Sequence, residues 1–371
     1  MRILIATDAW RPQVNGVVHT LEATAQAARV LGAEVSFLTH EGFPTVGIPS
    51  YPGIRVALPG SREIARRIAD VRPDAIHIAT EGPIGHFVRR YCLANRRPFT
   101  TSLHTRFADY IAARWPIPRN WTWQWLRWFH NAGRGTMVST ASLADELRSH
   151  GFHSVLPWPR GVDSALYHPS RACDLGLKRP IFLMVGRLAV EKNVDAFLGL
   201  DLPGTKVVVG DGPAREELAH RFPDAIFLGT KRGVELAAVY ASADVFVFPS
   251  LADTFGLVLL EALASGIPIA GFPVAATRDV VGAAPVAVLD NDLRAACLNA
   301  LALPRLACRQ YAETMTWEAS ARSFVDNLVA VRKLAWAPSL TKTTAPHSAP
   351  DSERAAWRNF PSPRLWKRTP P

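Results

Sequence analysis

Short apolar runs rich in β-branched residues recur along the chain, and stretches with helical periodicity separate them. The first series is Ile3–Ala6, Val35–Thr39, Ile54–Leu58, Ala75–Ala79, Phe99–Leu103 and Met137–Ser139. The second series is Ile181–Val185, Lys206–Val209, Ala225–Leu228, Val245–Phe248, Ile267–Ala270 and Val286–Leu289. Strands that alternate with helices form parallel sheets. The chain is therefore predicted to be an α/β protein with two doubly wound, Rossmann-like domains.

A chain of 371 residues is longer than one hydrophobic core usually organises. The proline-containing stretch Trp158–Pro169 and the polar residues after it are typical of a linker. We expect domains at 1–170 and 171–334. Residues 335–371 are rich in Pro, Ser and basic residues and lack periodicity, so this tail is predicted to be disordered in isolation.

The net charge of +10 is unevenly distributed. Residues 1–170 carry 19 Arg and no Lys against 12 acidic residues, whereas residues 171–334 carry 17 basic and 18 acidic ones. An anionic partner is therefore expected at the first domain. The sequence shows neither an RNA-stacking motif nor a recognition helix, so nucleic acid is not the expected partner. No stretch has the roughly 18 apolar residues of a spanning helix, and the start resembles a strand rather than a signal peptide, so a cytoplasmic location is expected.

Ligands of doubly wound sheets bind at the carboxyl ends of the strands. Gly16 follows the first strand and opens a helix, where backbone amides can approach a phosphate, although such a turn also needs glycine for its geometry. Arg187 and Lys192 follow the strand Ile181–Val185 and suit a diphosphate, unless they form a solvated group with Glu191.

A second group of candidates follows the strand Val245–Phe248. Asp253 lies in a loop with Phe255 and Gly256, where it could bind a ligand or cap the next helix. Glu261 lies about two turns into that helix, within an apolar run, so it would reach another part of the same ligand.

Five segments together resemble the retaining GT-B glycosyltransferases of family 4, over residues 1 to about 330. They are "RPQVNGV", "RGVDSALYHP", "VGRLAVEKN", "VGDGP" and "ADVFVFPSLADTFGLVLLEALASGIPIA". The resemblance implies two Rossmann-like domains facing a central cleft, the first binding the acceptor and the second a nucleotide-sugar. It also allows the last helix to pack back on the first domain.

The resemblance implies a role for each donor residue. Glu261 would bind the ribose, Arg187 and Lys192 the diphosphate, and Gly16 would close over the phosphates. Asp253 would bind the sugar together with the amides of Phe255 and Gly256. The family more often has Glu at the position of Asp253, which is one methylene shorter.

The resemblance also places His104 near the anomeric centre of the sugar, where a bare histidine at a strand end would otherwise be assigned a structural role. Tyr110 is a further candidate for this pocket. No cofactor is expected, and no metal, since the chain has no Asp-x-Asp motif and its four cysteines lack C-x-x-C spacing. Front-face attack by the acceptor hydroxyl is implied, with retention of configuration.

The segment "RNWTWQWLRWFH" holds four tryptophans. In a helix, Trp121, Trp125 and Trp128 share one face and Trp123 lies nearly opposite. They could form a core. The surrounding residues 86–135 carry nine arginines and one acidic residue, a composition typical of a segment at an anionic membrane surface.

The segment "SREIARRIADV" has a similar pattern, with Ile64, Ile68 and Val71 on one face of a predicted helix. The neighbouring arginines, Arg62, Arg66 and Arg67, make it a short basic amphipathic helix. Both segments lie in the domain expected to bind the acceptor. A membrane lipid acceptor therefore explains the charge and the tryptophans together.

The resulting hypothesis is transfer of a hexose or uronic acid from a UDP-sugar to a lipid of the diacylglycerol type, by an enzyme associated with the inner face of the cytoplasmic membrane. Members of the resembled family that glycosylate diacylglycerol or phosphatidylinositol favour it. One alternative is a GDP-mannose-dependent mannosyltransferase acting on a lipid or oligosaccharide. The other is a non-catalytic basic protein that binds membranes. The oligomeric state is not predicted.

Overall fold

Six parallel strands form the first sheet, in the order β2-β1-β5-β6-β7-β8. In chain order they are β1 (Arg2–Ala6), β2 (Glu34–Leu38), β5 (Ala75–Ile78), β6 (Thr100–Ser102), β7 (Thr136–Val138) and β8 (Val155–Pro157). The computed structural model describes residues 1–13, 15–48, 51–104 and 118–333, apart from the side chains of 48 and 51–54. The predicted disordered tail lies outside these residues.

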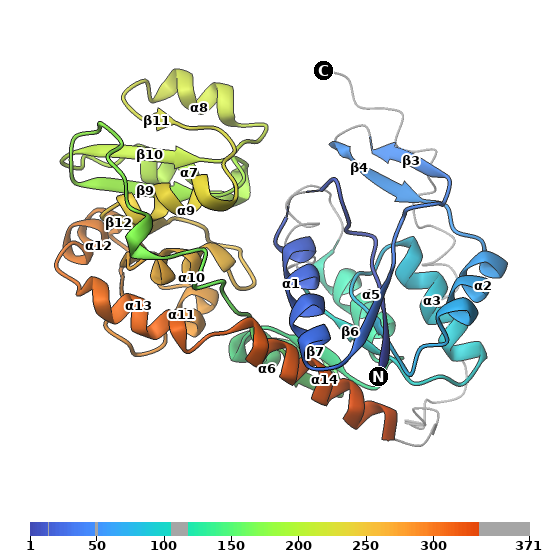
Figure 1. Cartoon of the computed structure of the whole chain (residues 1–371). Coiled ribbons are helices and arrows are strands. Elements are labelled where there is room, and N and C mark those ends of the chain that lie inside the picture. Colours follow the sequence, from blue (N-terminus) through green and yellow to red (C-terminus); the bar gives the residue numbers. More distant parts are fainter. Residues whose placement is uncertain (14, 49–50, 105–117, 334–371) are drawn as a thin grey trace. The chain divides into compact units, whose positions relative to one another are not determined.

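Six parallel strands also form the second sheet, in the order β11-β10-β9-β12-β13-β14. They are β9 (Ile181–Val185), β10 (Thr205–Val209), β11 (Ile226–Phe227), β12 (Val245–Phe248), β13 (Ile269–Gly271) and β14 (Ala287–Leu289). The prediction of two doubly wound sheets is confirmed (Figure 1).

Two details of the strand prediction were wrong. The run Ile54–Leu58 falls largely in β4 (Tyr51–Ala57), which pairs antiparallel with β3 (Thr45–Ile48) in a separate two-stranded sheet. The strand β8 was missed because it has three residues and ends in proline. Pairing with β7 makes it a strand, and that pairing is a property of the fold.

Helices connect the strands of both sheets. In the first half they are α1 (Gly16–Val30), α2 (Ser61–Val71), α3 (Pro83–Ala94), α5 (Arg119–His130) and α6 (Ala141–Ser149). In the second half they are α7 (Val194–Leu198), α8 (Arg215–Arg221), α9 (Gly233–Ser242), α10 (Leu257–Ala264), α11 (Ala275–Val281), α12 (Leu293–Ala300), α13 (Arg305–Glu313) and α14 (Trp317–Lys333). Two short 3-10 helices are η1 (Pro169–Arg171) and η2 (Val190–Lys192).

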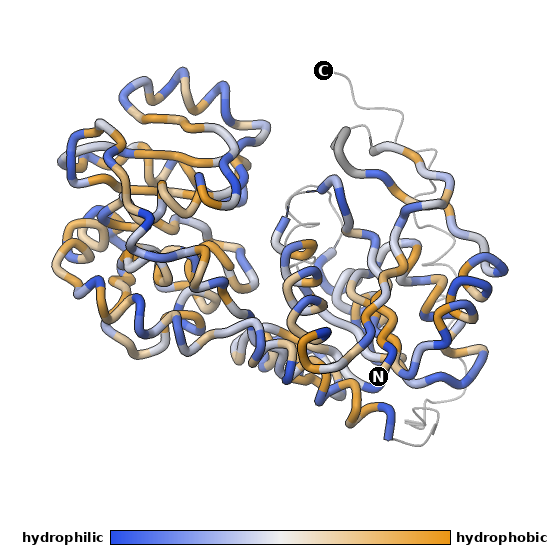
Figure 2. Tube along the Cα trace, in the orientation of Figure 1, coloured by the Kyte–Doolittle hydropathy of each residue, from blue (hydrophilic) through white to orange (hydrophobic). Residues whose placement is uncertain are grey.

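Apolar residues cover both faces of each sheet, as buried parallel strands require. In β1, Ile3 and Ile5 pack with α1, whereas Leu4 faces the opposite layer with α2 and α3. Successive side chains of a strand point to opposite faces, so an unbroken apolar run fills two layers. Figure 2 shows the strands mainly in the apolar colour and α8 mainly in the hydrophilic one.

The last helix belongs to the core of the first sheet. Phe324 and Leu328 of α14 are buried in the same cluster as Ile3 and Ile5. The stretch that connects the two sheets, residues 158–169, is anchored at both ends. Trp158 lies in this cluster, and Tyr167 lies in the main core of the second sheet.

Candidate active site

The loops after β9 and β12 bring two opposite charges together. Lys192 ends η2, and its Nζ donates to Oδ1 of Asp253 at 2.6 Å. The other oxygen of Asp253, Oδ2, is buried and has no hydrogen-bond partner among the described residues. A buried acceptor without a donor costs free energy. Asp253 is therefore placed to accept a hydrogen bond from a ligand hydroxyl.

This ion pair was not predicted, since Lys192 was assigned to a diphosphate and Asp253 to a sugar. Arg187 is exposed and lies close to the carboxyl end of β9, in the loop that leads to Lys192. Arg187, Lys192 and Asp253 therefore all lie at one edge of the second sheet. One of the two cations, Lys192, is already paired with Oδ1 of Asp253.

The start of α10 presents backbone amides beside this pair. Gly256 adopts a left-handed φ of +84°, and an added Cβ would lie 3.0 Å from Cζ of Phe248, so glycine is required by both geometry and space. The side chain of Phe255 is buried in the core, which leaves only its backbone for a ligand. The first amides of a helix lack intrahelical partners and favour negative charge.

Glu261 projects from α10 between two tyrosines. Its Oε2 accepts a hydrogen bond from the hydroxyl of Tyr240 at 2.9 Å. Burial raises the pKa of Glu261 to about 7, although hydrogen bonds from Tyr240 and Tyr167 act in the opposite direction. The carboxylate is thus enclosed and oriented while the residue keeps some exposure. Such an acceptor suits a ribose diol.

Gly16 opens α1 opposite the start of α10. A Cβ added at Gly16 would lie 3.7 Å from Cδ1 of Leu257, which is ordinary contact, and its φ does not demand glycine. The expectation of bare amides needs correction: Oδ1 of Asn15 accepts from the amides of Val17 and Val18 at 3.0 Å each. Asn15 is therefore the helix cap that the sequence analysis overlooked.

His104 lies two residues after β6, and both of its ring nitrogens have protein partners. Nε2 is 2.9 Å from Oγ of Ser102, and Nδ1 is 3.4 Å from a guanidinium nitrogen of Arg160. Burial, and then Arg160, lower the pKa of His104 well below its ordinary value, so the ring is neutral. Guanidinium groups only donate, so Nδ1 accepts and the proton resides on Nε2.

The backbone of His104 contacts the loop after β12, which carries Asp253. Its carbonyl accepts a hydrogen bond from Oγ1 of Thr254 at 2.7 Å, and Thr254 is the chain neighbour of Asp253. Thr254, Arg160 and the two tyrosines around Glu261 were not predicted to be site residues. Arg160 and Tyr167 lie inside the quoted segment "RGVDSALYHP", which was the available signal.

The tryptophan segment forms α5, and its tryptophans are not the core. The buried face of α5 consists of Thr122, Leu126, Phe129 and His130. Trp121 is 59% exposed and Trp128 is 47% exposed. Trp125 and Trp123 are half-buried and stack on histidines, Trp123 on His150 with 4.0 Å between ring centroids. The predicted shared face exists, and two of its three indoles remain at the surface.

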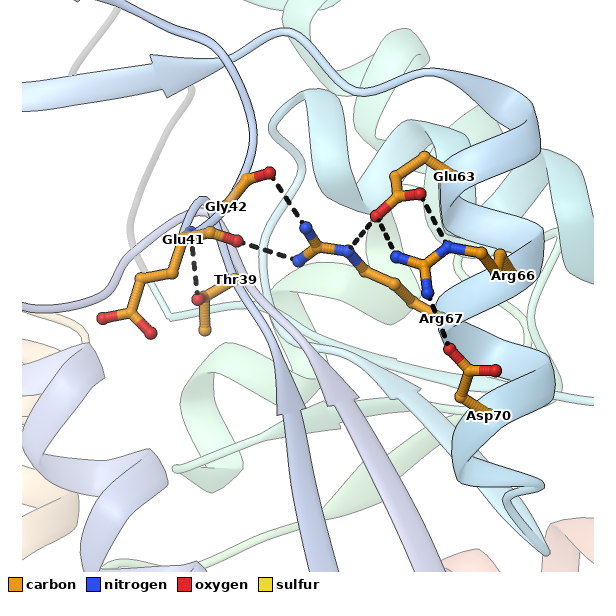
Figure 3. Close-up of polar contacts among 7 residues, drawn as sticks. All are labelled: Thr39, Glu41, Gly42, Glu63, Arg66, Arg67 and Asp70. Atoms are coloured by element: carbon orange, nitrogen blue, oxygen red, sulfur yellow. Dashed lines mark hydrogen bonds and ion pairs between the residues drawn. The ribbon is translucent and has the colours of Figure 1, made fainter.

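The interpretation of α2 as a helix facing a membrane needs correction. Ile64 and Ile68 are fully buried in the core of the first sheet, so this apolar face is already covered. Figure 3 shows Arg66 and Arg67 both donating to Glu63, and Arg67 also donates to the carbonyls of Glu41 and Gly42. Their charges stabilise the fold locally.

Arg62 is exposed at the start of α2. Tyr110 lies outside the described residues. Within the described part of the chain, no group of three or more His, Cys, Asp or Glu side chains could hold a metal ion. No helix in that part is both long and apolar enough to cross a membrane.

Comparison with known proteins gives matches along most of the chain. Residues 14–166 match the family model "Glycosyltransferase Family 4", and residues 179–303 match "Glycosyl transferases group 1". A GDP-mannose-dependent alpha-mannosyltransferase of Corynebacterium glutamicum is 32% identical over 73% of this chain and 72% of its own length. The sulfoquinovosyl transferase SQD2 of Arabidopsis thaliana is 30% identical over 72% and 58%. The alpha-monoglucosyldiacylglycerol synthase of Acholeplasma laidlawii is 26% identical over 72% and 79%.

Solved structures share the fold. The sucrose-phosphate synthase of Thermosynechococcus elongatus superposes with a TM-score of 0.75 at 18% identity, covering 89% of this chain and 98% of that one. Anabaena HepE in complex with UDP and glucose gives a TM-score of 0.68 at 15% identity, covering 89% and 100%. With its two family matches and its relative of 32% identity, this chain belongs to glycosyltransferase family 4 and is a glycosyltransferase of the GT-B fold.

Proposed function

We propose that this glycosyltransferase moves a hexosyl or uronosyl group from a UDP-sugar to a membrane lipid such as diacylglycerol, with retention of configuration and without a divalent metal. The observation that carries the donor half of the proposal is the buried, unpartnered Oδ2 of Asp253 beside Lys192. A sugar hydroxyl is a donor of the right size and polarity for this oxygen.

The donor would then occupy the edge of the second sheet. Glu261 would accept from the ribose, and Arg187 and Lys192 would contact the diphosphate. The departing phosphate would be stabilised by these cations and by the free amides at the start of α10. Neutral His104 would lie near the anomeric carbon, where the acceptor hydroxyl attacks from the front face and the phosphate helps to take its proton.

A lipid acceptor is supported by the surface of α5. Trp121 and Trp128 expose about half of their side chains on a helix that also carries Arg127, which is exposed as well. Indole rings favour the level of lipid headgroups, and guanidinium groups favour anionic lipid. The name of the Acholeplasma relative, which contains diacylglycerol, points in the same direction. We propose peripheral association with the inner face of the cytoplasmic membrane.

A second candidate is mannosyl transfer from GDP-mannose to a lipid or oligosaccharide. The relative from Corynebacterium, at 32% identity, favours it by name. The residues proposed to bind the donor would contact its ribose, diphosphate and sugar and not its base, so they suit either nucleotide. Membership of an enzyme family makes the third hypothesis, a non-catalytic membrane-binding protein, unnecessary.

The test is a parallel transfer assay on the full chain. Radiolabelled UDP-glucose, UDP-glucuronate, UDP-galactose and GDP-mannose are each incubated with diacylglycerol in anionic vesicles, and the lipids are separated by thin-layer chromatography. A labelled lipid from one UDP-sugar supports the proposal. Label from GDP-mannose alone supports the second candidate, and an unlabelled lipid with all four donors would overturn the proposed acceptor.

The same assay is run with the variant Arg187→Ala, and Arg171→Ala is its matched control. Arg187 is proposed to bind the diphosphate, whereas Arg171 donates to the carbonyl of Leu166 in the connecting stretch. The first substitution should abolish labelling and leave the fold intact. The second should leave labelling close to the wild-type level.

A further inference from the structure

Arg160 is a buried cation without an acidic partner among the described residues. It follows β8 in the segment Trp158-Pro-Arg-Gly161, and only 5% of it is exposed. One guanidinium nitrogen donates to the carbonyl of Trp158 at 2.6 Å, and another lies 3.4 Å from Nδ1 of His104. The guanidinium also lies over the indole of Trp158, 4.4 Å from the ring centroid.

All these partners are neutral. Burial lowers the pKa of Arg160 to about 9, and no acidic group among the described residues opposes that effect. The pKa values of His77 and His104 are also lowered, in part by Arg160 itself, so both rings are uncharged at neutral pH. A guanidinium offers five donors, of which the described contacts use two. A buried charge without a counter-charge is expensive, and none of the described residues supplies one for Arg160.

Arg89 shows what a structural buried arginine looks like in the same half of the molecule. It is 8% exposed, and burial lowers its pKa to about 10. Its guanidinium donates to the carbonyls of Trp128 and Phe129 at the last turn of α5 and lies 3.8 Å from the indole centroid of Trp128. Cations at a helix C-terminus offset its negative end, so Arg89 has a counter-charge, whereas Arg160 has none among the residues that the structure describes.

The position of Arg160 indicates that a substrate could supply its counter-charge. Arg160 contacts His104, the carbonyl of His104 accepts from Thr254, and Thr254 is next to Asp253. This chain of contacts connects Arg160 to the unpartnered oxygen proposed for the donor sugar. Arg160 belongs to the half of the chain that would hold the acceptor, whereas Arg187 and Lys192 belong to the other half.

We propose that Arg160 is an anion-binding residue of the transfer site and contacts a phosphate, carboxylate or sulfonate oxygen of a substrate. The assignment of that oxygen to a substrate rests on the proposed function. Three parts of the substrates carry such oxygens: the donor diphosphate, an acidic donor sugar and an anionic acceptor headgroup. The guanidinium fork suits all three chemically.

The first experiment measures anion binding without turnover. Thermal unfolding of the full chain is followed as inorganic phosphate is raised at constant ionic strength. Wild type and Arg89→Gln should show the same phosphate-dependent rise in Tm, because Arg89 already has its partners. In Arg160→Gln the rise should fall by at least half, and Arg160→Lys should restore part of it. An equal rise in wild type and Arg160→Gln overturns the proposal.

The second experiment identifies the source of the anion by matched pairs of substrates. It compares the kcat/KM of wild type and Arg160→Gln with UDP-glucuronate against UDP-glucose, and with phosphatidylinositol against diacylglycerol. Loss of a charge-assisted hydrogen bond should lower kcat/KM about tenfold or more, and only for the anionic member of one pair. An equal loss for every substrate, together with weaker UDP binding, assigns the diphosphate.

The two experiments distinguish failure of the proposed function from failure of the proposal for Arg160. If the wild type transfers no sugar to any lipid, the proposed acceptor is wrong, and the phosphate-dependent Tm still decides whether Arg160 binds anions. If transfer occurs and Arg160→Gln matches the wild type in every substrate pair and in UDP affinity, Arg160 is not part of the transfer site.

Discussion

At the scale of single residues, Glu261 shows how the fold changes the chemistry of a side chain. The sequence places it in an apolar helix, and the structure encloses its carboxyl between Tyr167 and Tyr240. Its pKa is raised to about 7, so the folded protein holds a proton that an unfolded chain releases near pH 4.5. Its contribution to stability is therefore present below pH 4.5 and is lost as the pH rises through 7.

Glu261→Gln should reverse this loss. The amide keeps the hydrogen bond from Tyr240 and never ionises, so the variant should gain stability relative to wild type between pH 5 and pH 8. The full shift corresponds to roughly 3 kcal/mol in the free energy of unfolding, which is an upper limit. Urea unfolding of both proteins at the two pH values measures it, and a constant difference would contradict the assignment.

Glu63→Gln is the control for this pH dependence. Arg66 and then Arg67 hold the pKa of Glu63 down to about 2, so its stabilising charge is present above pH 4.5 and lost only as the pH falls through 2. The difference between this variant and wild type should therefore be the same at pH 5 and pH 8.

Because Lys192 and Asp253 form an ion pair, Asp253→Asn should affect nucleotide binding and turnover differently. Asp253→Asn removes the charge that occupies Nζ of Lys192, so this amine becomes free for a diphosphate. UDP should bind at least as tightly as to wild type. The hydrogen bond to the sugar should weaken, and kcat/KM should fall about tenfold to a hundredfold. Calorimetry with UDP and the transfer assay test the two parts, and weaker UDP binding would contradict the first.

Among the elements, α2 is a basic helix in which Arg66 and Arg67 form ion pairs and hydrogen bonds within the fold. Arg67 connects α2 to the loop after β2 through the carbonyls of Glu41 and Gly42, and it lies 4.0 Å from the ring centroid of Phe43. Arg67→Ala should lower the free energy of unfolding by about 1–3 kcal/mol. Exposed Arg62→Ala is the matched control and should change it by less than about 0.5 kcal/mol. Equal effects in denaturant unfolding would contradict this division.

For the helix α5 we expect a different outcome, because two of its four indoles, those of Trp121 and Trp128, remain about half exposed. Trp121→Ala combined with Trp128→Ala should weaken binding to anionic vesicles about tenfold or more and leave the hydrolysis of the donor unchanged. Vesicle sedimentation measures the binding.

Trp123→Ala is the control on the same helix. Trp123 stacks on His150 and packs beside the core cluster of Leu126. This change should lower Tm and leave vesicle binding intact. If the surface pair instead lowers Tm as much as Trp123→Ala does, the exposed indoles serve the fold rather than a membrane.

At the scale of the whole molecule, the chain returns to its first sheet after completing its second. Phe324 of α14 is fully buried against the layer of Ile3 and Trp158. Phe324→Ala should lower the free energy of unfolding by about 3–5 kcal/mol, because it leaves a cavity in that core. Leu306→Ala, at a position that is 68% exposed, is the control and should change little. Urea unfolding distinguishes them, and similar midpoints would contradict the core assignment.

Much of the candidate site could be predicted from local patterns. Arg187, Lys192, Asp253 and Glu261 lie where strands end or where a charge interrupts an apolar helix, and these features are visible in the sequence. The partners of these residues could not be predicted. Lys192 and Asp253 are 61 positions apart, and the hydroxyl of Thr254 meets a carbonyl 150 positions away.

The α/β class follows from the sequence, because apolar runs of strand length that alternate with helices bury both of their faces in parallel sheets covered by helices. The sequence also determined which loops carry charge. Which of these charges are paired depends on the tertiary structure. It neutralised Arg66 and Arg67 locally, enclosed Glu261 and, within the described part of the chain, left Arg160 without a counter-charge. The physical reason is that periodicity depends on neighbours in the chain, whereas desolvation and ion pairing depend on neighbours in space.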